Sequence, residues 1–355
     1  MSNRYQIALV PGDGIGPEII PGAWEVLQAA AERSQVRLDG TSFPFGAGHY
    51  QRHGVFMPPD GLDTLRRFDA IFFGAVGLPA VDDRLPAKEY TFRVRSGFRQ
   101  YVNYRPVKRY AGVPGPLRTD KNFDFVVVRE NTEGEFTLAG SEHHLDDPEG
   151  FATQLSVFTR KGITRVARYS FELARRRKKR LTNVTKSNTL IHGLSYWDRV
   201  IGEVSRDFPD VHCEKMYVDN AAANLVLRPE HFDVLLTTNM IGDILSDLGG
   251  ALMGSLGMAP SGNINPEREF PSMFEPIHGS APDIAGRGIA NPVGTIESGA
   301  LMLEHLGEPS AADLVRRAVS GALRDGIRTP DLAGTATTAE MCRAILQRLD
   351  AVSGK

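Results

Sequence analysis

Two aspartates four residues apart carry the strongest chemical signal in the sequence. Asp243 and Asp247 lie in TTNMIGDILSDLGGALMGSLG, residues 237–257. A strand is predicted to end at Thr238, and a helix that follows it places both carboxylates on one face. Carboxylates this close repel each other, so the pair is either solvated or bridged by a cation. Because the neighbouring residues are small and apolar, we expect a buried helix whose aspartates bind Mg²⁺ or Mn²⁺ rather than Zn²⁺.

A loop and three arginines could bind an anionic ligand. Residues 274–296 are rich in Gly, Pro and Ala, without helical or strand periodicity. This composition predicts a ligand-binding loop. The three arginines, each near a strand-like or Pro-ended stretch, are Arg95, Arg105 and Arg129. A single arginine is more often in a surface salt bridge, whereas three that converge would grip carboxylates bidentately.

The segment PGDGIGPE, residues 11–18, resembles a dinucleotide fingerprint only at first sight. Its glycines are wrongly spaced, and no acidic residue ends a second strand about 20 residues later, since Asp39 lies in a polar stretch. We therefore interpret it as a tight strand-to-helix turn that could touch a ligand.

Strand-like and helix-like segments alternate and predict an α/β protein. Short apolar runs predict strands at residues 6–10, 70–73, 125–128, 181–185 and 234–238. Helical periodicity predicts helices at residues 17–32, 164–178, 189–205 and 338–350. The polar stretch 138–152 is predicted to be a loop or protruding arm, and its adjacent His143 and His144 are expected at the surface rather than on a metal.

Composition excludes several classes of protein. The 355 residues contain 41 Lys plus Arg and 43 Asp plus Glu, and a net charge of −2 argues against nucleic-acid and membrane-surface binding. No apolar run is long enough to cross a bilayer, and the N-terminus lacks signal-peptide features. Cys213 and Cys342 are far apart and are interpreted as small buried hydrophobes. We expect a cytoplasmic enzyme.

Seven segments, taken together and in order, resemble one family. They are PGDGIGPE, NYRP, VRENTEGE, VTKSN, VDN, NMIGDILSD and HGSAPDIAGRGIANP. The family is that of the isocitrate and isopropylmalate dehydrogenases, which are metal-dependent β-hydroxyacid oxidative decarboxylases. The resemblance covers nearly the whole chain. Three stretches are most similar to the tartrate/D-malate branch: VTKSN, FFGAVG and FPSMFEPIHGSAPDI.

The resemblance implies a two-domain, isopropylmalate-dehydrogenase-like α/β fold. A discontinuous cofactor-binding domain would comprise residues 1–100 plus 256–355. It would surround an inserted domain, residues 101–255, that carries dimerisation and the metal and substrate groups. The active site would lie in the cleft between the domains.

The resemblance also implies residue roles. Asp243 and Asp247 match two metal ligands, and Asp219 matches a third that the partner subunit of a homodimer contributes. Lys186 matches the catalytic lysine, which also acts across the interface, with Asp219 beside it in the catalytic set. The residues implied in substrate binding are Arg95, Arg105, Arg129, Thr91 and Phe136.

The loop implied in cofactor binding contributes His278, Gly279, Ser280, Ala281, Asp283, Ile284 and Asn291. Members that use NAD place an acid at the position of Asp283, to bind the ribose hydroxyls. Such an acid would repel the 2′-phosphate of NADP, so the expected cofactor is NAD.

Two positions depart from the family pattern. Phe136 stands where members place the tyrosine that protonates the enol after CO₂ is lost, so decarboxylation is in doubt. The alternative is that Phe136 only packs and that a neighbouring tyrosine donates. Thr91 and Phe92 replace the apolar pair that selects branched substrates in the isopropylmalate branch.

The sequence therefore predicts an NAD-dependent, Mg²⁺- or Mn²⁺-assisted dehydrogenase of a small 2-hydroxy dicarboxylate, tartrate- or D-malate-like. One alternative is a dehydrogenase of the 3-isopropylmalate or isocitrate type. Others are a non-catalytic partner subunit, against which the retained lysine and aspartates argue, and a metal-dependent hydrolase, against which the cofactor loop argues.

Overall fold

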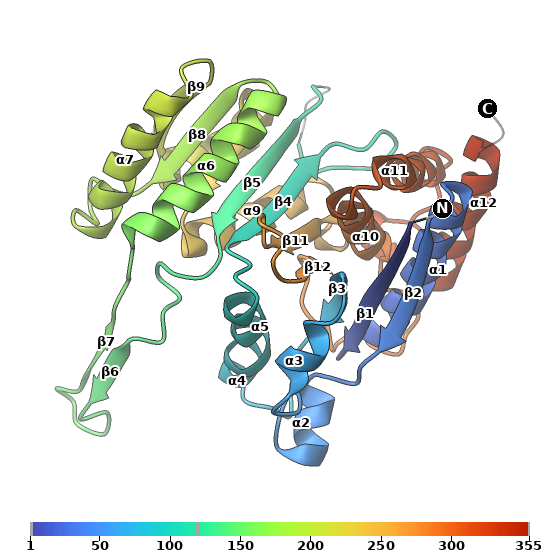
Figure 1. Cartoon of the computed structure of the whole chain (residues 1–355), viewed down its shortest axis with the longest axis horizontal. Helices are drawn as coiled ribbons and strands as arrows, with labels where there is room; N and C mark the ends of the chain where they lie inside the picture. The colour runs from blue at the N-terminus through green and yellow to red at the C-terminus, as the bar shows by residue number, and fades with distance from the viewer. Residues whose placement is uncertain (1–2, 118–120, 354–355) are drawn as a thin grey trace.

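The computed structural model describes residues 3–117 and 121–353, and one large sheet runs through both halves of the molecule (Figure 1). Its ten strands follow the spatial order β2-β1-β3-β12-β11-β4-β5-β10-β8-β9. In chain order they are β1 (Arg4–Gly12), β2 (Arg37–Ser42), β3 (Ala70–Ala75), β4 (Val102–Lys108), β5 (Asp124–Glu130), β8 (Arg180–Thr185), β9 (His212–Tyr217), β10 (Val234–Thr237), β11 (Pro260–Ile264) and β12 (Ser272–Pro276).

The outer parts of this sheet are parallel and its middle is antiparallel. Strands β2, β1, β3 and β12 are parallel neighbours, and so are β5, β10, β8 and β9. Between them, β11 pairs antiparallel with β12 and β4, and β4 pairs antiparallel with β5. Residues 260–276 thus lie between β3 and β4. The division into 1–100 plus 256–355 and 101–255 is compatible with this order and stays a prediction.

Helices pack on the sheet in two groups (Figure 1). Near β1–β3 lie α1 (Gly16–Arg33), α10 (Val293–Leu306), α11 (Pro309–Arg324) and α12 (Thr338–Ser353). Near β5, β8, β9 and β10 lie α6 (Arg160–Arg176), α7 (Gly193–Val204), α8 (Val218–Leu227) and α9 (Asn239–Leu252). Shorter elements are α2 (Ala47–His53), α3 (Gly61–Leu65), α4 (Arg84–Pro86), the π-helix η1 (Ala87–Thr91), α5 (Phe92–Gly97), and the single 3₁₀ turns η2 (Ser205–Asp207), η3 (Pro229–His231), η4 (Leu256–Met258) and η5 (Pro330–Leu332).

The central strands are buried on both faces, which explains their continuous apolar runs. All six residues of β3 are buried, including Phe72 and Phe73. Phe72 belongs to the larger of two apolar clusters, whereas Phe73 belongs to a smaller one beneath α2–α5. The two faces of this strand therefore hold the sheet to helices on either side.

The predicted strands and helices are confirmed, with ends that differ by a few residues. Two predictions are wrong in part. Residues 138–152 do protrude, but they contain β6 (Gly140–His143), which pairs with β7 (Phe151–Gln154). Residues 274–296 are not one loop, because they include the end of β12 and the start of α10. The strands β6 and β7 have only four residues each, too few for the alternation of apolar and polar residues that predicts a strand.

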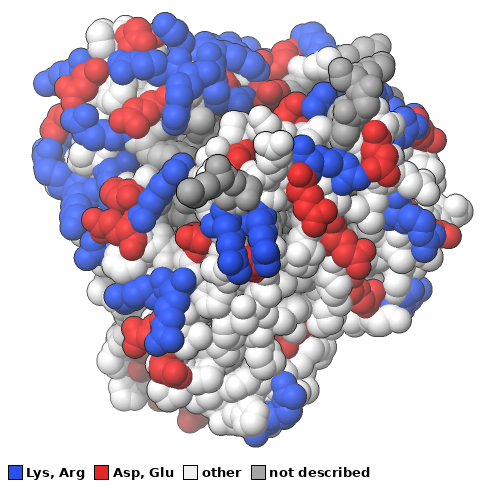
Figure 2. All heavy atoms as spheres, turned by 45° about the vertical axis from the view of Figure 1, so that its right-hand side comes forward, with Lys and Arg blue, Asp and Glu red and all other residues white. Residues whose placement is uncertain are grey.

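Charged side chains of both signs are interspersed over the face in Figure 2, with Lys and Arg more frequent at its upper left. His143 and His144 are exposed. Among the described residues, no helix is both long and apolar enough to cross a bilayer.

Candidate active site

Three arginines that are far apart in the sequence converge in the interior. Arg105 on β4 and Arg129 on β5 belong to adjacent antiparallel strands, and Arg95 lies on α5. Their exposed fractions are 6% for Arg95, 5% for Arg105 and 2% for Arg129. The structure thus brings the predicted substrate clamp together. Buried guanidinium groups need anionic partners, because they remain charged.

Asp243 pairs with two of these guanidinium groups and so supplies part of the negative charge that they need. Arg129 forms an ion pair with Asp243, and its Nε donates to Asn239 Oδ1 at 2.9 Å. Arg105 Nη1 donates to Ser246 Oγ at 2.6 Å and lies 3.5 Å from Asp243 Oδ1.

The third arginine has its own acid on β12. Arg95 Nη2 lies 3.1 Å from Glu275 Oε1, which also accepts from Asn263 Nδ2 at 2.6 Å. Sequence analysis missed Glu275, although an acid inside an apolar strand was a possible signal. This acid fixes Arg95 within the group.

Some hydrogen-bonding capacity in the cluster is unused. Among the described residues, no group accepts a hydrogen bond from the buried Nε of Arg95 or of Arg105. Burial, followed by the nearby charge of Arg105, lowers the pKa of Arg129 to about 9. The cluster is therefore short of negative charge, and an anionic ligand would supply it.

Asp243 and Asp247 lie on α9 beside these arginines, with side chains 44% and 57% exposed. Burial raises the pKa of Asp247, and Asp243 raises it further, while Arg105 opposes the shift. The expectation of a wholly buried helix is wrong, because Ile244 between them is 61% exposed. Two partly exposed carboxylates with hard oxygen atoms fit a divalent cation such as Mg²⁺ or Mn²⁺.

Lys186 and Asp219 form a second charged pair. They follow the parallel neighbours β8 and β9, so the ends of these strands bring them together. Lys186 Nζ donates to Asp219 Oδ1 at 2.6 Å, and this bond lowers the pKa of Asp219. Within residues 3–117 and 121–353, no three His, Cys, Asp or Glu side chains of this chain are grouped to hold a metal. Asp219 thus does not join the α9 pair within one chain.

Two aromatic rings border the arginine cluster. Phe136 and Phe92 stack with their ring centroids 6.3 Å apart. The Arg129 guanidinium lies 5.4 Å from the centroid of the Phe136 ring. Phe136 therefore presents an apolar surface without a proton donor, directly beside a buried cation.

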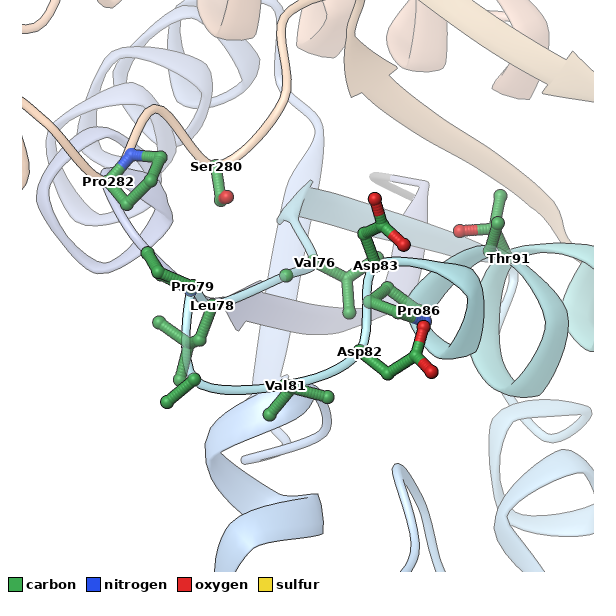
Figure 3. A pocket seen from close by; sticks show the side chains of 13 residues that line it. Val76, Leu78, Pro79, Val81, Asp82, Asp83, Pro86, Thr91, Ser280 and Pro282 are labelled. Atoms are coloured by element: carbon green, nitrogen blue, oxygen red, sulfur yellow. The ribbon is translucent and has the colours of Figure 1, made fainter. Parts of the chain in front are cut away.

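A cavity of about 770 Å³ opens next to α4 and η1. Its lining comes from residues 76–83, Thr91 and the loop that includes Ser280 and Pro282. Figure 3 shows Ser280 and Pro282 on one side and Thr91 on the other. The structure thus places Thr91 and Ser280 on one cavity, and their roles in binding substrate and cofactor stay predictions. Sequence analysis named Val76 and Gly77 only within FFGAVG and missed residues 78–83, whose Pro-containing stretch was the available signal.

The residues predicted to bind the cofactor lie in a loop after β12. Their contacts with a cofactor stay a prediction. His278 Nδ1 lies 2.9 Å from the Gly279 carbonyl oxygen, while its buried Nε2 has no partner among the described residues. Burial lowers the pKa of His278, so the ring is neutral at pH 7. Asp283 and Gly279 are exposed, and Ala281 and Ile284 are half-buried.

At the far end of this loop, the side chain of Asn291 already forms hydrogen bonds within the protein. Asn291 Nδ2 donates to Asp331 Oδ2 at 3.0 Å, and Asn291 Oδ1 accepts from the Val293 N–H at 3.0 Å. Asn291 therefore acts in the protein alone as an anchor of the loop. The orphaned His278 Nε2 and the exposed Asp283 fit a nucleotide with hydroxyl and base groups.

The PGDGIGPE turn holds these loops in place. The buried Asp13 carboxylate accepts from the N–H groups of Ala47, Gly48 and Gly77 at 2.7, 2.8 and 3.0 Å. Glu18 accepts from the N–H groups of Gly286 and Gly288.

Glycine is required in this turn where it meets the cofactor loop. Gly14 has φ +60°, and an added Cβ would lie 1.9 Å from the Ser280 carbonyl oxygen. The turn thus acts as a scaffold for the loops that line the cavity. That it could also touch a ligand stays a prediction.

Three comparisons with known proteins agree. Residues 6–345 match the family model described as isocitrate/isopropylmalate dehydrogenase. A probable tartrate dehydrogenase/decarboxylase of Agrobacterium vitis is 50% identical over 346 residues, which cover 96% of this chain and 97% of the relative. The decarboxylating D-malate dehydrogenase of Escherichia coli strain K12 is 45% identical over 355 residues, covering 97% and 98%.

The crystal structure of isocitrate dehydrogenase from Methylococcus capsulatus is similar with a TM-score of 0.88 at 36% identity, covering 97% of this chain and 99% of that one. The predicted α/β fold class and the predicted resemblance to the tartrate/D-malate branch are confirmed. The chain therefore belongs to the isocitrate/isopropylmalate dehydrogenase family of oxidoreductases.

Proposed function

We propose that this protein oxidises a small 2-hydroxy dicarboxylate, similar to tartrate or D-malate, with NAD and Mg²⁺ or Mn²⁺. The observation that carries the proposal is the buried cluster of Arg95, Arg105 and Arg129, which has unpaired Nε donors beside the partly exposed carboxylates of Asp243 and Asp247. Arginines bind the carboxylates of such a substrate, and the aspartates hold the ion that its 2-hydroxyl and carboxylate would chelate. The names of the relatives support this substrate class.

The chemistry divides between the bound groups and the chain. When bound, the cation would supply the charge that lowers the pKa of the substrate hydroxyl, and NAD would supply the acceptor for the hydride. The chain orients the substrate through its arginines. A cation bound nearby would favour the neutral form of Lys186, whose Nζ would then take the hydroxyl proton, and Asp219, its partner at 2.6 Å, holds the amine in place.

We further propose that Lys186 and Asp219 act on the site of the partner subunit in a homodimer. Asp219 is not grouped with the α9 aspartates in the described part of one chain. Large apolar side chains on α8 and α9 are also exposed, including Leu227 and Ile244. Apolar surface of this kind is typical of a subunit interface.

NAD is proposed over NADP because Asp283 lies exposed on the cofactor loop. Its charge would repel a 2′-phosphate. Asp283→Lys combined with Ile284→Tyr should move the preference toward NADP by about tenfold or more. If the wild type already prefers NADP, the assignment of this loop fails.

Phe136 makes decarboxylation slow in this proposal. Its ring cannot donate a proton, and it lies against Arg129 and Phe92. Oxidation at C2 needs no donor there, whereas protonation of the enol does. Because an enolate that is not protonated can recapture CO₂, net CO₂ release should lag NADH formation, unless water or the Thr137 hydroxyl donates the proton instead. The Thr137 hydroxyl donates its hydrogen bond to the Leu155 carbonyl oxygen. Water is therefore the better candidate for the proton donor.

The deciding experiment is a panel of 2-hydroxy diacids assayed with NAD or NADP, with and without Mn²⁺. We expect NADH formation from D-malate or tartrate that requires Mn²⁺. A preference for isocitrate or 3-isopropylmalate would move the protein to those branches. No turnover with any diacid would instead favour a non-catalytic partner subunit. The cytoplasmic location stays a prediction that fractionation would test.

A further inference from the structure

A second cavity, of about 360 Å³, lies at the opposite edge of the sheet from the candidate active site. It is lined by Tyr5 at the start of β1, residues 66–69 before β3, residues 268–271 before β12, and residues 305–306 at the end of α10. These are the amino ends of parallel strands, whereas Ser280 and residues 76–83 follow their carboxyl ends. The cavity is therefore separate from the catalytic groups.

Arginines dominate the charge of this cavity. In the described part of the chain, Arg66, Arg67 and Arg268 have no carboxylate within the 4.0 Å ion-pair distance. Of the two acids in the lining, one pairs with an arginine outside the lining, and the other accepts a hydrogen bond from an uncharged backbone group, so three arginines face one unpaired acid. Asp69 Oδ2 accepts from the Gln6 N–H at 2.7 Å, and Glu269 pairs with Arg99 at 3.0 Å. The cavity is left with an excess of positive charge.

The cationic wall is held in position before any ligand arrives. The guanidinium of Arg66 lies 5.1 Å from the centroid of the Phe270 ring, and that of Arg99 lies 5.4 Å from it. Asn265 Oδ1 accepts from the N–H groups of Glu269 and Phe270 at 2.8 and 3.2 Å, which fixes the loop before β12. A pre-ordered site loses less entropy on binding.

His305 completes the wall with an uncharged polar group. Burial, followed by the charge of Arg268, lowers its pKa to about 4. At neutral pH the ring therefore offers hydrogen-bonding nitrogens and adds no charge.

The same loop connects directly to α5. The Phe270 ring stacks on that of Phe98 at 6.2 Å, and Gln100 Nε2 donates to the Pro271 carbonyl oxygen at 2.8 Å. Phe98, Arg99 and Gln100 directly follow α5, the helix that carries Arg95 and ends at Gly97. A ligand that draws Arg66 and Arg268 together would act on the loop and, through these contacts, on α5.

We infer that this cavity binds a small polyanion and that its occupancy restrains α5. The shared chemistry is two or more anionic oxygens, from a phosphate ester or from a polycarboxylate, because the guanidinium fork matches both. A volume of about 360 Å³ is at the small end of ligand pockets, which favours a compact anion. Binding can be measured without turnover, so the inference does not depend on the proposed reaction.

The test is calorimetry on the full-length protein without divalent cations, with pyrophosphate and tricarballylate as the two probes. For at least one probe we expect a site that depends on Arg67 and Arg268, in addition to any binding at the arginine cluster of the candidate active site. The probe that binds more tightly identifies the phosphate or the carboxylate source. Arg67→Ala and Arg268→Ala should each raise the Kd at least tenfold. Both residues are exposed, so both variants should fold, which thermal melting checks.

The matched control is Arg317→Ala, an exposed arginine on α11 that pairs with Asp313 at 3.0 Å. It should leave the Kd unchanged. Hydrogen exchange in residues 92–100 should slow when the probe binds to wild type, and not in Arg268→Ala. Absence of binding by both probes, or an unchanged Kd in both cavity variants, would overturn the site. Binding without protection of residues 92–100 would overturn the link to α5.

Discussion

Asp13 and the arginine cluster are both buried and charged, yet they use their hydrogen-bonding capacity differently. Three backbone N–H groups surround the Asp13 carboxylate at 2.7–3.0 Å. In the cluster, the Nε atoms of Arg95 and Arg105 have no partner among the described residues, and the pKa of Arg129 is lowered.

The difference separates a structural charge from one reserved for a ligand. A carboxylate whose lone pairs are occupied by backbone holds loops together and has little left to offer a ligand. Guanidinium groups left partly unpaired destabilise the empty site and bind an anion more strongly, since the desolvation cost is already met in the fold. Five variants can break or sharpen this contrast.

The largest effect is expected at Asp243 and Asp247. Replacing either with Asn removes an anionic ligand, and kcat/KM should fall on the order of 10³-fold, about 4 kcal/mol. Steady-state kinetics at varied Mn²⁺ measures this effect. The exposed Asp313→Asn on α11 is the control and should change nothing. Unchanged turnover together with unchanged Mn²⁺ affinity in both variants would remove the metal assignment.

Asp13→Asn should act on stability instead. The amide nitrogen turns a donor toward backbone donors, so the free energy of unfolding should fall by about 3 kcal/mol. Chemical denaturation measures this loss. In the folded fraction, substrate KM should change little. A stable variant with a greatly raised substrate KM would show that Asp13 belongs to the ligand site after all.

His305 represents a third case, a half-buried group that stays neutral at pH 7. Its pKa falls from 6.5 to about 4, so between these values the unfolded chain binds more protons than the folded one. Its contribution is therefore complete above pH 6.5 and is lost as the pH falls toward 4, by up to about 3 kcal/mol. Denaturation at pH 7 and pH 4.5 should show a smaller difference in His305→Gln than in wild type. An equal pH dependence in both proteins would contradict the shift.

Phe136→Tyr adds a hydroxyl beside the cluster. A positioned general acid is worth roughly 10²–10⁴-fold, and we expect the lower end, about 10²-fold, in the rate of CO₂ release. NADH and CO₂ are followed together in both proteins, with the NADH rate as the internal control. Equal and fast release of both in wild type, without a gain in the variant, would show that the missing hydroxyl is irrelevant.

Sequence reasoning predicted the parts of the molecule that have a period or a motif. The apolar run Ala70–Phe73 and the helix carrying Asp243 and Asp247 are in place. The three arginines converge, although spacing alone left that open.

The remaining features depend on contacts between distant residues, which one sequence does not reveal. Nothing local marks Glu275 as the partner of Arg95, 180 positions away. The strands β6 and β7 are four residues each and wholly exposed, so no apolar alternation marks them. The exposure of Ile244 likewise depends on what packs against α9.

The place of β12 in the sheet has a consequence for synthesis of the chain. It pairs with β3 in the register Phe274↔Phe72, so roughly 200 residues must be translated before β3 acquires this neighbour. At about 5–20 residues per second, the wait is on the order of 10–40 s. During that time the nascent β3 presents an apolar open edge, which is a hazard for aggregation. Slow formation of such long-range pairs should make this step, rather than closure of β1 on β2, limit the rate at which the newly made protein folds.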